Sequence, residues 1–191
     1  MASDRDKMLA CVDKDCQPIG ESVNRNYHYG NLGKADTWVC GIMYFIIDNE
    51  GRVLLIERTS EKEHTPGRIS APSRHLYPEQ ETYVEGLANE IGVAYSRTNF
   101  VSFVQVDVIC TILPKRMLVR YCVLQITDEC KSQIKINENE ACAHRFEPWQ
   151  TARKAFLLSS DTNGAYAFHG NDKREAVIEE LDRHVAKILE N

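Results

Sequence analysis

The 191 residues are enough for one domain with a sizeable core, and two full domains would be a tight fit. Hydrophobic residues make up 43% of the chain and charged residues 27%, which is ordinary for a soluble globular protein. The net charge is −5 and no basic stripe is present, so a nucleic-acid partner is not expected.

No apolar run approaches the about 20 residues that cross a bilayer, so no membrane contact is expected. The first residues, Met1–Gln17, lack the apolar centre of a secretory signal. The seven cysteines are an odd number without a C-x-x-C pair, which favours reduced thiols and no zinc site. These features predict a cytoplasmic protein.

The chain divides into an N-terminal arm, residues 1–36, and one domain, residues 37–191. The arm is polar, and we expect it to be irregular with one short helix near Asp4–Val12. Two strands follow, Trp38–Ile47 and Arg52–Arg58, and Asp48–Gly51 has the composition of the turn between them.

A long loop, Thr59–Pro78, contains three prolines, and loops of this length in compact domains are usually functional. A helix is predicted over Glu79–Ile91, because four apolar residues recur at helical spacing and Gly92 follows as a stop. Further strands and two helices complete the chain. The strands are Phe100–Leu113, Met117–Ile126, Gln133–Ile136 and Ala141–Phe146, and the helices are Pro148–Leu157 and Lys173–Leu189. Strands in hairpins indicate an α+β fold rather than a doubly wound sheet.

This order of elements resembles the Nudix superfamily, whose motif is G-x5-E-x7-R-E-U-x-E-E-x-G-U, with U aliphatic. When Gly92 is aligned with the last glycine of the motif, the R-E-U-x-E-E segment falls on Glu85–Glu90. The upstream motif Glu falls on Tyr77 and the upstream Gly on Ala71, so Glu90 alone remains of the polar signature. The resemblance covers about residues 37–157 and implies a sheet sandwiched between helices.

Nudix hydrolases use Mg²⁺, which takes hard oxygen ligands, to clamp a diphosphate and activate water. Their ligands come from one helix face, which here carries Gly86, Asn89 and Glu90. Glu85 with Glu90 is a weak alternative metal site, and a solvated acidic face is the simpler interpretation. No cofactor is expected, and Mg²⁺ only if the chain is a hydrolase. Gly86 costs about 1 kcal/mol inside a helix, which suggests room for a ligand or for a neighbouring chain, as in a homodimer.

The segment Pro66–His75 also resembles the isopentenyl diphosphate isomerase branch of this superfamily. The resemblance places His75 on a metal-ligand His and Ser73 at or next to the catalytic Cys. The second His ligand falls near Val39, and the paired glutamates fall near Arg120-Tyr121. Neither is present, so true isopentenyl isomerase activity is not expected.

Eight residues form the candidate site. The candidate catalytic residues are His75, Arg74, Tyr121 and Glu90, and the candidate substrate-binding residues are Ser73, Arg58, Trp38 and Glu140. Each has a plainer interpretation. Arg74 and Arg58 can be surface cations, and His75 can be a structural histidine. Glu140 can be a carboxylate in a turn, and Trp38 and Tyr121 can be aromatic residues of the core.

Three hypotheses remain open. The first is a metal-independent enzyme of isomerase or cyclase type, with biosynthetic chemistry on a small, largely apolar molecule. The second is an altered Nudix hydrolase of a nucleoside or prenyl diphosphate. The third is a non-catalytic module that binds a ligand or a partner protein.

Overall fold

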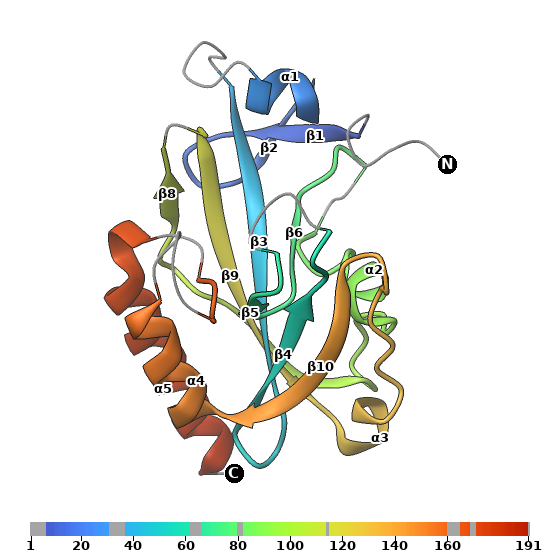
Figure 1. Cartoon of the computed structure of the whole chain (residues 1–191), viewed down its shortest axis with the longest axis vertical. Helices are drawn as coiled ribbons and strands as arrows, with labels where there is room; N and C mark the ends of the chain where they lie inside the picture. The colour runs from blue at the N-terminus through green and yellow to red at the C-terminus, as the bar shows by residue number, and fades with distance from the viewer. Residues whose placement is uncertain are drawn as a thin grey trace.

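The computed structural model describes residues 7–30, 37–61, 66–79, 82–113, 115–159, 165–168 and 171–190. One mixed sheet lies between α4 and α5 on one face and α2 and α3 on the other (Figure 1). The strands are β1 (Met8–Val12), β2 (Pro18–Asn24), β3 (Trp38–Ile47), β4 (Arg52–Arg58), β5 (Ile69–Ser70), β6 (Ser73–His75), β7 (Phe100–Gln105), β8 (Cys110–Ile112), β9 (Met117–Ile126) and β10 (Ala141–Pro148). The helices are α1 (Arg25–Gly30), α2 (Leu87–Ile91), α3 (Asp128–Lys131), α4 (Trp149–Leu158), a 3-10 turn (Asn171–Lys173) and α5 (Arg174–Leu189).

The central strand of the sheet is β3. Along its whole length it pairs in parallel with β9, from Val39↔Met117 to Ile47↔Gln125. Its other edge is shared by β1, β6 and β4 in succession, all antiparallel. The strands β7 and β8 extend the sheet beyond β9, and β10 extends it beyond β4. The predicted α+β sandwich is therefore confirmed.

Alternation along β3 divides the hydrophobic core into two layers. Ile42, Tyr44 and Ile46 face α2 and α3, whereas Phe45 and Ile47 face α4 and α5. Successive side chains of a strand point to opposite faces of its sheet. Because both faces are covered, the strand is apolar along its length, which is why its sequence shows no alternation of polar and apolar residues.

The N-terminal segment is not an irregular arm. Met8–Val12 is a strand, so the predicted helix is wrong there, and residues 4–6 lie outside the described part of the chain. This strand pairs with β2 and, through Cys11↔Val39, with β3. Leu9, Ala10, Cys11 and Val12 are all buried, so β1 is part of the main sheet.

Most of the later elements agree with the sequence. The helices α4 and α5 lie where they were expected, and α5 buries one apolar face, made of Val177, Ile178, Leu181, Val185 and Ile188. The long strand before β9 is split into β7 and β8. The short strand predicted at Gln133–Ile136 is wrong: the Gln133 amide closes a turn onto Cys130, and the buried Ile134 packs against the α2 layer.

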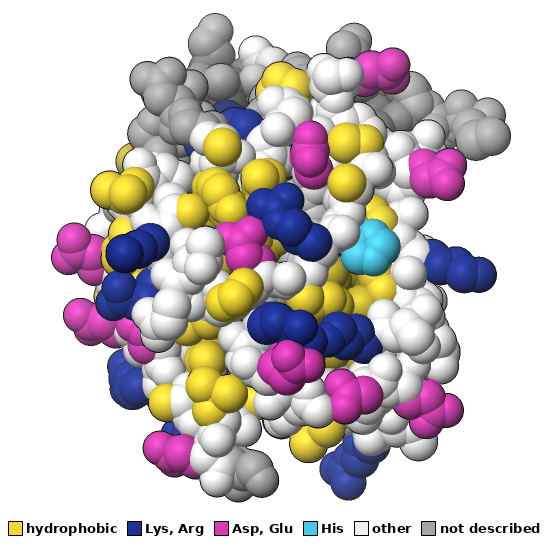
Figure 2. All heavy atoms as spheres, turned by 60° about the horizontal axis from the view of Figure 1, so that its bottom comes forward, with side chains coloured by type: hydrophobic (Ala, Val, Ile, Leu, Met, Phe, Trp, Pro, Cys, Tyr) yellow, Lys and Arg dark blue, Asp and Glu magenta, His cyan; other side chains and the backbone are white. Residues whose placement is uncertain are grey.

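The surface carries charges of both signs. On the face shown in Figure 2, cationic and anionic side chains are interspersed with hydrophobic ones. Among the described helices, none is both long and apolar enough to span a lipid bilayer.

The turn between β3 and β4 is fixed by a buried carboxylate. Asp48 has no exposed surface, and its Oδ2 accepts from Lys131 Nζ at 2.6 Å and from Arg52 Nε at 2.9 Å. Burial by itself would raise the pKa of Asp48, but hydrogen bonds from Lys131 and Arg52 outweigh it and hold the pKa below its ordinary value of 3.8. The turn predicted at Asp48–Gly51 is thereby tied to α3.

Replacing Asp48 by Asn should destabilise the protein by about 2–3 kcal/mol, because two cations lose their buried counter-charge. A carboxylate whose folded-state pKa is depressed stabilises the fold above its unfolded pKa. That contribution is lost as the pH falls through the lower folded-state value. Urea unfolding at a series of acidic pH values should therefore show a smaller pH dependence for Asp48→Asn than for wild type. An equal change of the free energy of unfolding with pH in the two proteins would contradict this account.

Candidate functional site

The helix at the Nudix motif position is shorter than its sequence pattern suggests. Only Leu87–Ile91 is helical, and residues 83–86 form turns instead. The predicted end is confirmed: Gly92 adopts φ 72°, and a Cβ there would approach the Lys135 carbonyl to 2.9 Å. Part of the predicted helix, residues 80–81, lies outside the described residues.

Side chains from the sheet hold the turns before α2 in place. Tyr44 Oη donates to the Tyr83 carbonyl at 2.6 Å, and Tyr83 Oη donates to the Cys16 carbonyl at 2.8 Å. Burial is the main cause that raises the pKa of both phenols, that of Tyr83 to about 12, so both stay neutral donors. Tyr44 thus satisfies one carbonyl of the turns, and Tyr83 fastens them to the β1–β2 turn, so the segment is held in place without being helical.

Arg74 fastens the other end of these turns. It stands on β6 opposite Ile42, whose side chain faces α2, and its Nη1 donates to the Gly86 carbonyl at 2.9 Å. A Cβ at position 86 would come within 3.0 Å of Arg74 Cδ, Nη1 and Nε. The guanidinium carbon also lies 4.8 Å from the centre of the Tyr77 ring. Gly86 thus leaves open the space that the Arg74 side chain fills.

Arg58, Glu140 and Glu90 are the other charged residues near α2 and the end of β4. Arg58 ends β4 and pairs with Ala141, and the next amide, Thr59 N, donates to the Glu140 carbonyl at 3.3 Å. Burial lowers the pKa of the half-buried Arg58 guanidinium, while the nearby Glu140 and Glu90 carboxylates raise it. Glu90 is also near Tyr44, as Arg74 is: the Glu90 carboxylate raises the pKa of the Tyr44 phenol, and the Arg74 guanidinium lowers it. We refer to Arg58, Arg74, Glu90 and Glu140 as the α2 site.

The remaining predicted residues lie elsewhere. Ser73 and His75 flank Arg74 on β6, so their side chains point to the opposite face, and His75 Nε2 is hydrogen-bonded to Tyr29 Oη. Trp38 begins β3 opposite Val12 and packs at the edge of the α2 layer of the core.

Tyr121 agrees with its plainer interpretation as a core aromatic, and it lies in the layer of the core away from Glu90. It has no exposed surface and stacks on Phe168 at 5.7 Å, in the core under α4 and α5. Its neighbour Arg120 faces the α2 side instead, with its guanidinium 5.8 Å from the Tyr83 ring. Strand alternation forces this separation, because consecutive residues of β9 cannot share a face.

Glu85, the weak metal candidate, is exposed, and its Oε1 accepts from Thr82 N at 3.1 Å and from Thr82 Oγ1 at 3.0 Å. These bonds make the Glu85 carboxylate part of the turn before α2. The face that carries the motif therefore presents one carboxylate, Glu90, with the Asn89 amide and the Arg74 guanidinium. This set does not fit Mg²⁺, which requires several oxygen ligands in near-octahedral geometry. In the described part of the chain, no three His, Cys, Asp or Glu side chains are grouped as metal ligands would be.

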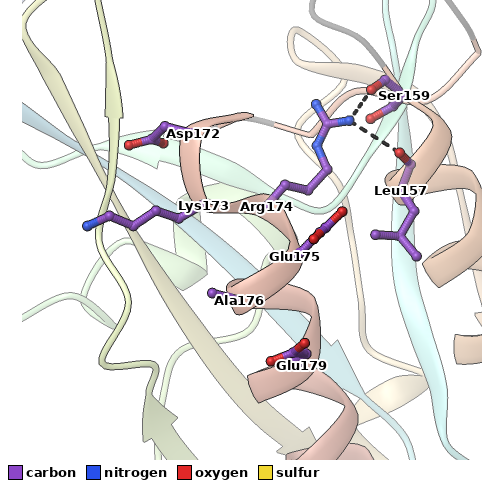
Figure 3. Close-up of a pocket in the computed structure, with 8 residues that line it drawn as sticks. All are labelled: Leu157, Ser159, Asp172, Lys173, Arg174, Glu175, Ala176 and Glu179. Carbon is purple, nitrogen blue, oxygen red and sulfur yellow. Dashed lines mark hydrogen bonds between the residues drawn. The ribbon is translucent and has the colours of Figure 1, made fainter.

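Two surface hollows lie away from the α2 site. The larger, about 780 Å³, lies between the end of α4 and the start of α5 (Figure 3). Arg174 donates there to the carbonyls of Ser159 and Leu157, while Asp172 and Lys173 bond to the β8 region through Thr111 and Ile109. The smaller, about 560 Å³, lies between α4 and Tyr166. Arg174, Asp172 and Lys173 thus hold the start of α5 to its neighbours (Figure 3), and no residue of the α2 site lines either hollow.

Solved structures share this fold. A Deinococcus radiodurans protein, DR0079, is 13% identical with a TM-score of 0.59, covering 93% of this chain and 98% of its own. The Nudix domain of Shewanella oneidensis NrtR, solved with ADP-ribose, is 11% identical with a TM-score of 0.55, covering 85% and 99%. A C. elegans Ap4A hydrolase in a binary complex is 10% identical with a TM-score of 0.53, covering 78% and 98%.

No protein-family model matches the sequence, and no curated protein is similar to it. The structural likeness therefore concerns the fold, and the predicted Nudix fold is confirmed.

The sequence did not reveal that Arg74 and Gly86 share one space. The signal was present in part, because a glycine inside an apolar helical pattern indicated room for something. The occupant comes from a strand twelve residues earlier in the chain. Tyr44 and Tyr83, which hold the turns, were not identified because apolar surroundings make such tyrosines look like core residues.

Gly86→Ala should displace the Arg74 side chain and destabilise the protein by about 1–2 kcal/mol, the cost of its hydrogen bond and ring contact. In an Arg74→Ala background the same change should cost much less, so a double-mutant cycle should show about 1 kcal/mol of coupling. Denaturant unfolding measures all four variants. Gly30→Ala is the control, because a Cβ there meets no atom within 4 Å. Equal costs for Gly86→Ala in the two backgrounds would show that the residues do not compete for space.

Proposed function

We propose that this protein binds a small molecule at the α2 site and converts it without a divalent metal, in an isomerase- or cyclase-type reaction. The observation that carries this proposal is the Arg74 guanidinium, which lies over Gly86 and the Tyr77 ring. Both positions correspond to glutamates of the Nudix motif. A cation there disfavours a bound metal ion, because like charges repel.

The carboxylates of the site supply the chemistry. Glu90 and Glu140 are both near enough to Arg58 to raise the pKa of its guanidinium. Two such groups held near a ligand can act as a base and an acid: one, as a carboxylate, removes a proton from carbon or oxygen, and the other, as a carboxylic acid, donates one to another atom of the ligand. Proton exchange with water then restores both groups. Such a transfer rearranges bonds within the ligand and needs no activated water. That is the reason to favour isomerisation or cyclisation over hydrolysis.

The charges also define the ligand. The Arg74 guanidinium bonds to two neutral carbonyls, so a wholly apolar molecule would leave its charge without a complement when it displaced water. We therefore propose a ligand with at least one anionic group, which narrows the expectation of a largely apolar substrate. The neighbours are consistent with this chemistry, since one was solved with ADP-ribose.

An altered hydrolase remains the competing candidate, and the likeness to an Ap4A hydrolase is the observation that favours it. A hydrolase of this fold would need a metal at Glu90 to activate water. The two candidates therefore differ in one measurable property, which is the effect of a chelator.

The test begins with a screen of the purified protein against prenyl diphosphates, ADP-ribose and small organic acids, with turnover followed by mass spectrometry. Turnover should be the same in EDTA as in Mg²⁺. Glu90→Gln and Glu140→Gln should each lower kcat by about 100-fold or more, because each removes a group that moves a proton. Glu129→Gln, at an exposed position on α3, should match wild type.

Turnover that is abolished by EDTA and restored by Mg²⁺ or Mn²⁺ would overturn the proposal in favour of the hydrolase. Binding of a ligand that neither wild type nor any added metal converts would instead identify a binding module.

A further inference from the structure

Arg74 is immobilised more firmly than a surface cation. Its Nη1 donates to the Gly86 carbonyl at 2.9 Å and its Nε to the His75 carbonyl at 3.3 Å, while its guanidinium packs on the Tyr77 ring. The side chain is half-buried, so part of it stays open to solvent. A guanidinium fixed in this way loses little further rotational freedom when it binds a ligand.

The bonds that hold Arg74 leave some of its capacity unused. A guanidinium has five N–H donors in a planar fork. Within the part of the chain that the structure describes, Nη2 donates to no residue, and the partners of Nη1 and Nε are neutral carbonyls. Arg74 therefore keeps donors that suit a carboxylate or phosphate oxygen, and the two groups that accept from it are uncharged.

Two neighbouring residues, Gly86 and Tyr77, leave room for the Arg74 guanidinium. Gly86 has no side chain where a Cβ would meet three Arg74 atoms, and Tyr77 offers a ring face rather than a carboxylate. Both residues occupy motif positions at which the fold family carries glutamate. The loss of two carboxylates and the placement of one guanidinium are thus a single coordinated change.

We propose that Arg74 is a built-in cation that takes the place of the divalent metal of this fold and binds the anionic group, carboxylate or phosphate, of the ligand. This inference rests on the proposed function of the α2 site and names the part of the ligand that the site recognises. Glu90 and Glu140 then lie near the rest of the ligand, where protons are moved.

The first test measures anion binding without turnover. The full chain in EDTA, at constant ionic strength, is titrated with inorganic pyrophosphate or with citrate and followed by calorimetry and thermal shift. Wild type should bind at least one probe saturably. Arg74→Ala should weaken binding about tenfold or more, and Arg74→Lys should weaken it less, since the charge remains but the planar fork is lost. Arg183→Ala, an exposed cation of α5, is the control and should bind as wild type does.

The probes separate the two ligand chemistries: binding of citrate alone assigns a carboxylate, and binding of pyrophosphate alone a phosphate. If neither probe binds wild type, or if both bind Arg74→Ala as tightly as wild type, the inference is overturned.

The second test reverses the change. The triple variant Arg74→Ala, Gly86→Glu, Asn89→Glu removes the cation and adds two carboxylates beside Glu90. It should bind Mn²⁺, measured by electron paramagnetic resonance, at least about tenfold more tightly than wild type. Wild type that binds Mn²⁺ as tightly as the triple variant would contradict the inference. Should the triple variant fail to fold, the anion titration still decides.

Neither measurement depends on catalysis. Loss of the proposed isomerase or cyclase activity would leave the anion titration unaffected, and failure of anion binding would leave the Glu90 and Glu140 kinetics to be judged separately.

Discussion

Position 86 must have no side chain while Arg74 occupies the space above it, and the arrangement of the site depends on this steric constraint. The Arg74 guanidinium bonds to the carbonyl that precedes α2, so the start of the helix is tied to the sheet through β6. Tyr44 and Tyr83 tie the same turns to β3 and to the β1–β2 turn. Glu90, one turn further along, is thereby held near enough to Arg58 to raise the pKa of its guanidinium.

The two faces of the sheet explain which candidate residues come together. Arg74 and Glu90 share the α2 face, while Tyr121 lies in the core beneath α4 and α5. His75 leaves this face as well and meets Tyr29 of α1. A sheet buried on both sides separates neighbouring residues of one strand as effectively as it joins residues of distant segments.

Under the proposed function, the α2 site replaces a bound divalent cation by a guanidinium that belongs to the protein. Several carboxylates around a divalent metal can activate water, whereas a fixed guanidinium can position an anion while nearby carboxylates move protons. The scaffold is unaffected by this exchange, because Leu87 and Ile91 still bury the inner face of α2. A fold can thus be retained while the residues of its site change.

The sequence by itself determined the order of the elements, the apolar strands β3, β4 and β9, the helices α4 and α5, and the departures from the Nudix motif at Gly86 and Asn89. These depend on local periodicity and on residue identity, which a sequence states directly. It did not predict β1, because a short buried strand and a short helix look alike. It also did not predict that α2 has only five residues. Tertiary structure alone decided that Arg74 fills the space of residue 86, since the two residues meet only when β6 pairs with β3 beneath α2.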